Sequence, residues 1–313
     1  MLAIAVNEYG GMPTVMQLSE PQPGHGQVLI RIKAAGVNPL DQMIADGALK
    51  AIAPATFPLV LGADFAGVVE TVGDGATRFS PGERVFGQLG IPSVGSNGSY
   101  AEYVAVGEDA ALARVPDGVE LTVAAALPTA GVAALQIVES LAPLAGKTVL
   151  LIGAAGGVGS FATQYAVNDG AHVIAVAKAA DERLLAYGAT EAIDYTKSSV
   201  AETVRQTHPD GIDVLIDLAS DADGFAALAS LVRSGGTALK TRFQYAADIE
   251  ALASRGVAGV NFEIKLSSEA LERLATDVLS GRIAVPPITV IAPDDLPRLD
   301  RTAPLEGKTV IAF

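Results

Sequence analysis

From about Leu121 the chain alternates short, almost continuously apolar segments with segments of helical pattern, and this alternation constrains the fold more than any other feature. The apolar segments include "KTVLLIG", "HVIAVA", "GIDVLIDL" and "GTALK". Helical segments such as "GVGSFATQYAVNDG" and "GFAALASLVRSG" separate them. Strands that are apolar on both faces and are joined through helices form a parallel sheet with helices on both sides. We therefore expect a doubly wound α/β domain here.

The first 110 residues have a different pattern. Short β-branched runs such as "QVLIRIKAAGV" and "ERVFGQ" are separated by turn sequences such as "PQPGHG", which predicts an antiparallel, barrel-like domain. The chain closes with one amphipathic helix, "SSEALERLATDVLSG", and two strands, "PPITVIA" and "GKTVIAF". We expect these strands to return to the β domain. The predicted domains are therefore residues 1–120 with 265–313, and an inserted α/β domain at residues 121–264.

Charge and hydropathy argue against two classes of partner. Lys plus Arg number 21 against 35 Asp plus Glu, a net charge of -14, whereas binding to nucleic acid or to an anionic membrane needs clustered cations. The longest apolar run, "VAAALPTAGVAALQIV", is interrupted by Pro128 and Gly131 and is shorter than the roughly 20 residues of a membrane span. The start "MLAIAVNEYG" resembles a first strand, not a signal peptide. These features predict a cytoplasmic protein with no nucleic-acid or membrane partner.

Residue usage also argues against a metal centre. The chain has no cysteine, so it can form neither a disulfide nor a thiolate-held metal site. Its three histidines, His25, His172 and His208, are scattered without the spacing of metal ligands. The sequence therefore predicts no metal site.

The stretch "VLLIGAAGGVGSFATQYA" runs from a buried strand through a small-residue turn into a helix. A pyrophosphate can bind at such a turn because small residues let the backbone approach it and the start of the helix favours negative charge. The fingerprint is A-x-G-x-x-G, with Ala154 in the place of the first glycine. The alternatives are a structural turn and a methyltransferase-type nucleotide site. The predicted dinucleotide-binding residues are Gly153, Ala154, Ala155, Gly156, Gly157, Val158 and Gly159.

The end of the following strand decides between NADH and NADPH. NAD enzymes place a carboxylate there for the ribose 2′-hydroxyl. Here the strand end carries Lys178, the nearest carboxylate is Asp181, and Arg183 is within reach. A cation suits a 2′-phosphate, so NADPH is the predicted cofactor, with Lys178 and Arg183 as its ligands. The alternative is that Lys178 is an ordinary solvated lysine.

Several stretches together resemble one family. They are "AAGVNPLDQMIADG", "PLVLGADFAGVVETVGDGATRFSPGERVFG", "GSYAEYVAV", "VLLIGAAGGVGSFATQYA" and "GATEAIDYTK". In these stretches the chain resembles the medium-chain dehydrogenase/reductase superfamily, in its zinc-independent quinone oxidoreductase branch. The resemblance implies a GroES-like β-barrel catalytic domain, an inserted Rossmann-type doubly wound parallel sheet, and a homodimer. The dimer would pair the last strand of the nucleotide-binding sheet, for which residues 256–264 are the candidate.

The same resemblance locates the catalytic site. Zinc alcohol dehydrogenases of this superfamily supply a cysteine and a His-Glu pair, and here Asn38 is near the cysteine position while Ala63 and Asp64 replace His-Glu. An enone or a quinone accepts hydride without a Lewis acid, because its carbon is already electrophilic. The resemblance implies that Asn38 faces the nicotinamide and donates a hydrogen bond to a substrate carbonyl.

The resemblance also singles out four further positions. Asp41 either holds Asn38 in place or is a turn residue without a catalytic role. Met43 occupies the position where members of this branch often carry a tyrosine, and Ala133 replaces a threonine in a "GVAA" turn. Tyr195 matches a tyrosine that flanks the adenosine phosphate in relatives, or is an ordinary strand-edge aromatic.

Two functions follow as hypotheses. The first is an NADPH-dependent oxidoreductase that transfers hydride to a quinone or an α,β-unsaturated carbonyl, with Asn38, Asp41 and Met43 in its catalytic site. The second is an NADPH-binding structural or redox-sensor protein with weak or no turnover, which the residues Met43 and Ala133 favour.

Overall fold

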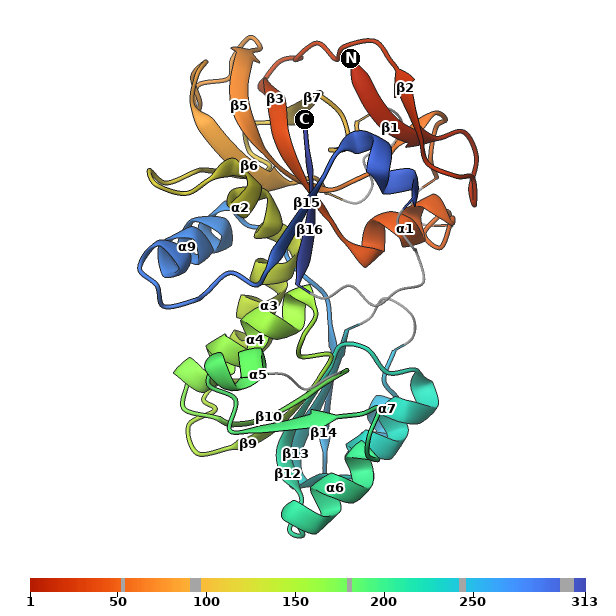
Figure 1. The fold of residues 1–313 in the computed structure, drawn as a ribbon, viewed down its shortest axis with the longest axis vertical. Helices are drawn as coiled ribbons and strands as arrows, with labels where there is room; N and C mark the ends of the chain where they lie inside the picture. The colour runs from red at the N-terminus through yellow and green to blue at the C-terminus, as the bar shows by residue number, and fades with distance from the viewer. Residues whose placement is uncertain (52–53, 91–96, 179–181, 242–245, 299–306) are drawn as a thin grey trace. The chain divides into compact units, whose positions relative to one another are not determined.

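A computed structural model describes residues 1–51, 54–90, 97–178, 182–241, 246–298 and 307–313. The chain divides into two compact units (Figure 1). The first consists of Met1–Val132 and Leu266–Phe313, and the second of Ala133–Lys265. We describe each unit by itself.

The first unit is built from two sheets. A three-stranded sheet has the order β2-β1-β4, and a seven-stranded sheet has the order β15-β16-β3-β5-β6-β8, with β7 also paired to β3. The strands are β1 (Leu2–Val6), β2 (Thr14–Gln17), β3 (Gln27–Val37), β4 (Leu59–Val60), β5 (Asp64–Val72), β6 (Arg84–Gln88), β7 (Tyr103–Gly107), β8 (Ala111–Arg114), β15 (Ile288–Ile291) and β16 (Lys308–Ala312).

Strand β3 organises the larger sheet because it pairs with three other strands. It is antiparallel to β5 along most of its length, to β7 over its first half and to β16 over its second half. The last strand of the chain therefore lies directly beside the segment that leads to Asn38. The unit also contains α1 (Pro39–Ala45), α2 (Leu121–Ala126), the start of α3 (Pro128–Leu141), α9 (Ser268–Leu279) and the 3-10 helix η1 (Pro293–Arg298).

The second unit is a parallel sheet with the strand order β11-β10-β9-β12-β13-β14. The chain enters this sheet at β9, in the middle, and adds β10 and β11 on one side before it continues with β12 on the other side. Right-handed crossovers therefore place the helices of the two halves on opposite faces of the sheet. Figure 1 shows α4 and α5 on one side and α6 and α7 on the other. The strands are β9 (Thr148–Ile152), β10 (His172–Ala177), β11 (Glu191–Asp194), β12 (Ile212–Asp217), β13 (Val232–Thr241) and β14 (Ala258–Phe262). The helices are α4 (Gly157–Asn168), α5 (Glu182–Ala186), α6 (Val200–Thr207), α7 (Ala222–Ala229) and α8 (Ile249–Ala253).

These features confirm the predicted fold class, a β domain combined with a Rossmann-type doubly wound parallel sheet. One local prediction was wrong. The "GVAA" segment at residues 131–134, expected as a turn, lies inside α3. Pro128 occupies the first position of that helix, where its fixed φ favours helix initiation, and the alanines that follow have high helix propensity. In the described ranges, no helix combines the length and the apolarity that crossing a membrane requires.

Candidate functional site

Asn38 occupies the junction between β3 and α1. Its backbone is extended, with φ -133° and ψ 150°, and Pro39 begins the helix. The Asn38 backbone N–H donates to Asp41 Oδ2 at 2.8 Å, so the third residue of the helix caps its start. Asp41 therefore holds Asn38 in place.

The side chain of Asn38 is bonded at both ends. Its Nδ2 donates to Asp64 Oδ2 at 2.9 Å, and its Oδ1 accepts from Lys308 Nζ at 2.7 Å. Lys308 also donates to the Val37 carbonyl at 3.2 Å. Asn38, Asp64 and Lys308 are each at most 5% exposed. These contacts distinguish the amide oxygen from the amide nitrogen, because an ammonium only donates and a carboxylate accepts.

Asp64 is the most enclosed carboxylate of this group, with no exposed surface. Its Oδ1 accepts from the Thr129 hydroxyl at 2.6 Å, and its Oδ2 accepts from the Thr129 backbone N–H at 3.0 Å. The Thr129 hydroxyl in turn accepts from Gln88 Nε2 at 2.7 Å. Burial raises the pKa of Asp64, while Lys308 and the bonds from Thr129 and Asn38 oppose that rise.

Asp41 and Tyr100 extend the same group. The Tyr100 hydroxyl donates to Asp41 Oδ2 at 2.6 Å, whereas Asp41 Oδ1 is buried and has no partner among the described residues. Burial raises the pKa of Asp41 to about 7 and the pKa of Tyr100 well above its ordinary value. Burial also lowers the pKa of Lys308, against the attraction of Asp64 and Asp41. A raised pKa of about 7 means that the Asp41 carboxyl titrates near neutral pH. We call the whole set the Asn38 network: Asn38, Asp41, Asp64, Tyr100, Thr129 and Lys308.

Sequence reasoning identified only part of this network. It singled out Asn38 and Asp41, treated Asp64 only as a replaced metal ligand, and missed Tyr100, Thr129 and Lys308. A lysine at the start of the apolar run "GKTVIAF" is a weak signal, since a lysine at a strand end is usually solvated. Met43, the third predicted catalytic residue, is half-buried in α1, two residues beyond the Asp41 carboxylate that Tyr100 contacts.

The Asn38 network does not fit a zinc ion. Zinc sites in proteins use thiolate, imidazole and carboxylate ligands, whereas the corresponding positions here offer an amide and one carboxylate. The amide oxygen of Asn38 already accepts from the Lys308 ammonium, and a second cation beside that ammonium would be repelled. Lys308 therefore supplies the fixed positive group of this site.

In the second unit, the predicted phosphate loop joins β9 to α4. Gly153 has φ +82°, a conformation that favours glycine, and its N–H and that of Ala154 both donate to the Val176 carbonyl. A Cβ on Gly159 would lie 2.1 Å from the Gly153 carbonyl oxygen, so this position admits no side chain. The glycine allows the helix to pack closely against the strand, which is the function of the third glycine in dinucleotide-binding turns.

The start of α4 offers donors for an anion. Gly156 is the N-cap, and the first helical i to i-4 bond runs from the Ser160 N–H to the Gly156 carbonyl at 2.9 Å. The amides of Gly157, Val158 and Gly159 precede that bond, so the helix itself gives them no acceptor. Together with the half-buried Ala155, they line a turn whose backbone fits the pyrophosphate of a dinucleotide.

The structure brings two further predicted cofactor residues together. Lys178 follows β10 and is exposed, and Tyr195 follows β11 and is 50% exposed. The two strands are paired at Ala177 and Asp194, and the Tyr195 N–H donates to the Ala177 carbonyl at 3.3 Å. Arg183 is half-buried in α5 and has interactions of its own. Asp181 lies outside the described residues.

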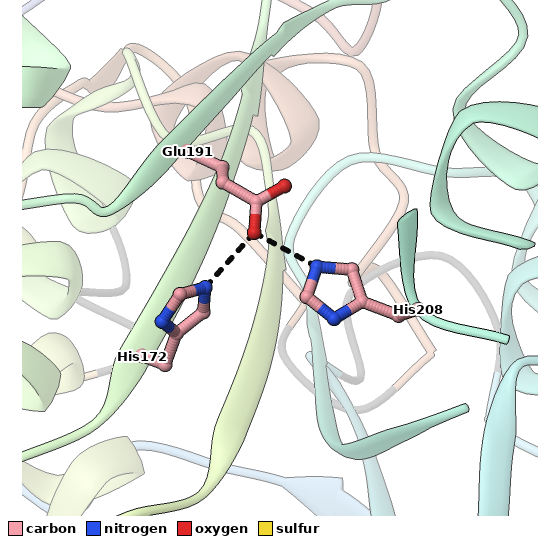
Figure 2. A group of neighbouring side chains, drawn as sticks. All are labelled: His172, Glu191 and His208. Carbon is pink, nitrogen blue, oxygen red and sulfur yellow. Dashed lines mark hydrogen bonds and ion pairs between the residues drawn. The ribbon is translucent and has the colours of Figure 1, made fainter. Parts of the chain in front are cut away.

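The fold overturns the expectation that the histidines are scattered. His172 and His208 lie on either side of Glu191 in the second unit, and both contact the same carboxylate oxygen (Figure 2). Although burial favours the protonated form of Glu191, the hydrogen bonds from the two imidazoles hold its pKa below the usual range. The sequence could not reveal this group, because its three members come from different elements.

Comparisons with known proteins agree with this geometry. A family model described as alcohol dehydrogenase GroES-like domain matches residues 24–117, and one described as zinc-binding dehydrogenase matches residues 157–241. The chain is 32% identical to human quinone oxidoreductase over 244 residues, covering 75% of this chain and 71% of that protein. It is 33% identical to the chloroplastic quinone-oxidoreductase homolog of Spinacia oleracea, covering 67% of this chain and 65% of that protein, which is just under two thirds of its length.

A solved structure, the quinone oxidoreductase from Coxiella burnetii, matches with a TM-score of 0.89 at 26% identity. That match covers 100% of this chain and 99% of the other. The matches confirm the family that the motifs around Asn38 and Gly159 indicated. The chain belongs to the medium-chain dehydrogenase/reductase superfamily, in its quinone oxidoreductase branch.

Proposed function

We propose that this protein is an NADPH-dependent, metal-independent oxidoreductase that reduces a quinone or an α,β-unsaturated carbonyl compound. The observation that carries the proposal is the bonding of Asn38 between Lys308 and Asp64, at the positions that correspond to metal ligands in the zinc enzymes. A preorganised amide donor suits a substrate whose carbonyl oxygen gains negative charge. Quinones and enones share that property, since each has a carbonyl conjugated to a carbon–carbon double bond.

The residues of the Asn38 network have separate tasks in this proposal. Asp64 uses one of the two amide hydrogens of Asn38, which leaves the second for a substrate oxygen. Lys308 bonds the amide oxygen and so polarises the amide, which strengthens its N–H as a donor. When bound, a reduced nicotinamide supplies hydride to the electrophilic carbon. Asp41 keeps the backbone of Asn38 in position and holds a proton near neutral pH.

Three features support a nicotinamide dinucleotide as the cofactor, and the last two of them favour NADPH. The loop from Gly153 to Gly159 offers backbone amides to a pyrophosphate, as described above. Lys178 is exposed at the carboxyl end of β10, where a 2′-phosphate of the adenosine ribose would bind. Tyr195 is exposed at the end of the neighbouring strand and could cover the same group.

The test is a turnover panel. Purified protein is mixed with NADPH and, in separate reactions, with benzoquinones, naphthoquinones and enones, and oxidation of NADPH is followed by absorbance with product analysis. We expect turnover with at least one conjugated carbonyl. When NADP⁺ and simple alcohols are supplied instead, we expect no reduction of NADP⁺. Tight NADPH binding without turnover on any member would instead favour the redox-sensor function.

The role of Asn38 has its own test. Replacing Asn38 with Ala removes the proposed oxyanion donor, so kcat should fall by roughly tenfold to a thousandfold while NADPH binding is nearly unchanged. The readouts are kcat on the best substrate of the panel and NADPH affinity by fluorescence. An unchanged kcat would assign Asn38 a structural role only.

A homodimer is also part of the proposal. Strand β14 lies at the edge of the six-stranded sheet, and the sheet order pairs it with β13. An edge strand of this kind can pair with the same strand of a second copy of the chain. Light scattering at micromolar concentration should give twice the chain mass. A cytoplasmic location stays a prediction, because the spinach relative is named as chloroplastic.

A further inference from the structure

His172, Glu191 and His208 form a compact group in the second unit. His172 Nε2 lies 2.9 Å from Glu191 Oε1, and His208 Nε2 lies 2.8 Å from the same oxygen. One ligand atom from each residue lies within 4.8 Å of the others. Figure 2 shows the two imidazoles converging on the carboxylate from opposite sides. The side chains are 40%, 31% and 19% exposed for His172, Glu191 and His208, so water can reach the group.

The parallel sheet explains why two of these residues meet. His172 and Glu191 are the first residues of β10 and β11, and the register pairs Ile174 with Glu191. Residues two apart in a strand point to the same face, so His172 and Glu191 share one face at the amino edge of the sheet. His208 arrives from outside the sheet as the C-cap of α6, where its N–H donates to the Val204 carbonyl at 2.7 Å.

We propose that His172, Glu191 and His208 bind a divalent transition-metal ion, with zinc as the best fit. Imidazole nitrogen and carboxylate oxygen are ligands that zinc prefers, and three protein ligands with water in the fourth position complete its tetrahedral shell. The ligands come from three elements, so a bound ion would link α6 to β10 and β11. A chain without cysteine can build such a site, because none of these ligands is a thiolate.

The three ligand atoms must move to reach the geometry of a zinc site. Ligands about 2.0–2.1 Å from a tetrahedral ion stand about 3.3 Å apart, whereas both imidazole nitrogens now stand 2.8–2.9 Å from the carboxylate oxygen. These two contacts must open by a few tenths of an ångström, and the two imidazole nitrogens, which lie within 4.8 Å of each other, must stand at the same spacing of about 3.3 Å. The partly exposed side chains of His172 and Glu191 leave room for this movement.

The proposed site is separate from the proposed reaction. It lies at the amino edge of the parallel sheet, whereas the loop from Gly153 to Gly159 and the residue Lys178 follow the carboxyl ends of their strands. A metal ion at this edge would stabilise the second unit without contacting the cofactor. Its loss should therefore lower the thermal stability of the protein and leave NADPH affinity unchanged.

The experiment uses the full chain without a polyhistidine tag, freed of metal with EDTA and dialysed. Titration with zinc chloride in a calorimeter should show one ion per chain, and zinc should raise the melting temperature. His172→Gln and His208→Gln keep a side-chain N–H donor for Glu191 but lose the imidazole ligand. Each variant should weaken zinc binding by about a hundredfold or more. Even the loss of a residue that only hydrogen-bonds to a metal ligand lowers metal affinity by about tenfold to a hundredfold.

The chain offers a matched control, because its third histidine, His25, belongs to the first unit. His25→Gln should bind zinc as the wild type does. Cobalt(II) provides a second readout: an intense visible band reports a four-coordinate site and should vanish in both variants. Absence of saturable zinc binding, or equal binding in the wild type and both variants, would overturn the proposal and leave a group held by hydrogen bonds alone. NADPH turnover is measured in parallel, so failure of the metal site and failure of the proposed function are distinguishable.

Discussion

The Asn38 network differs in assembly from the carboxyl edge of the parallel sheet, where we propose that the cofactor binds. We call this edge, with residues 153–159 and Lys178, the cofactor edge. In the network, hydrogen bonds join residues 26, 59 and 270 positions apart: Asn38 to Asp64, Asp41 to Tyr100, and Asn38 to Lys308. The cofactor edge depends on consecutive residues, the loop from Gly153 to Gly159, and on the exposed Lys178. The network is enclosed in the first unit, whereas Lys178 is in contact with water.

This difference has an energetic consequence. Charges removed from water depend on one another, because a buried charge that loses its partner keeps the full desolvation cost. An exposed cation is solvated by itself and gains little from a partner until a ligand binds. Changes in the network should therefore alter the stability of the whole protein, and changes at the edge should alter ligand choice alone.

The largest effect is expected from Lys308→Met, which tests the interdependence of the network. Removal of this ammonium leaves Asp64 buried without its cation, so the free energy of unfolding should fall by about 3–5 kcal/mol. Denaturant unfolding measures the change. The Lys197→Met variant is the control: Lys197 also pairs with an aspartate, Asp194 at 3.1 Å, but its side chain is 79% exposed, and we expect little change.

A double variant sharpens this test. If charge is the cause, Lys308→Met should cost much less in an Asp64→Asn background, because the unpaired carboxylate is then absent. An equal cost in both backgrounds would show that Lys308 stabilises the protein through its hydrogen bonds to Asn38 and Val37, and not through its attraction to the Asp64 carboxylate.

A smaller effect, confined to ligand choice, is expected at the cofactor edge. A charged hydrogen bond contributes about 1.5–3 kcal/mol, so Lys178→Ala should lower NADPH affinity roughly tenfold to a hundredfold with little effect on NADH. Lys178→Glu also repels the phosphate and offers an acceptor to a ribose hydroxyl, so the preference for NADPH should shrink or invert. Values of kcat/KM for both cofactors measure the preference.

Lys147→Glu serves as the control for this charge reversal. Lys147 immediately precedes β9, at the amino edge of the same sheet, and its reversal changes the net charge equally. The preference should stay as in the wild type. If the wild type prefers NADH, or if both reversals act alike, Lys178 is not the residue that selects the cofactor.

Counted per pH unit, the smallest effect is a pH dependence that arises from Asp41. Its pKa is about 7 in the folded protein and 3.8 in an unperturbed carboxyl, so between these values the folded state holds a proton that the unfolded state lacks. Its contribution to stability is complete below the lower value and is lost as the pH rises toward 7, by up to about 1.4 kcal/mol per pH unit.

The Asp41→Asn variant separates this contribution from the titration of Asp64. Both proteins contain Asp64, so the difference between their free energies of unfolding at each pH reports Asp41. Denaturant unfolding between pH 4 and pH 8 should show a wild-type stability that declines relative to the variant as the pH rises. Parallel curves would mean that Asp41 is already ionised in the folded protein. Tyr100 and Lys308 would then outweigh the burial of this carboxylate.

Local features of the fold were predictable because adjacent residues determine them. The strand "HVIAVA" is β10 at residues 172–177, and the helix after the glycine turn is α4. The requirement for Gly159 also follows from local geometry, since its neighbours in space are Gly153 and Ala154. The "GVAA" error shows the limit of motif matching, because a short motif borrowed from relatives was overridden by the helix propensity of its surroundings.

By itself, therefore, the sequence determined the order of strands and helices, the glycine turn at residues 153–159 and the place of Lys178 at the end of a strand. The physical causes of these features are periodicity, turn chemistry and consecutive small residues. Only the tertiary structure decided that Lys308 would contact Asn38 and that His172 and His208 would meet at Glu191. These groups assemble because strand pairing and helix packing bring distant side chains together, and burial then changes their protonation. No spacing along the chain encodes that proximity.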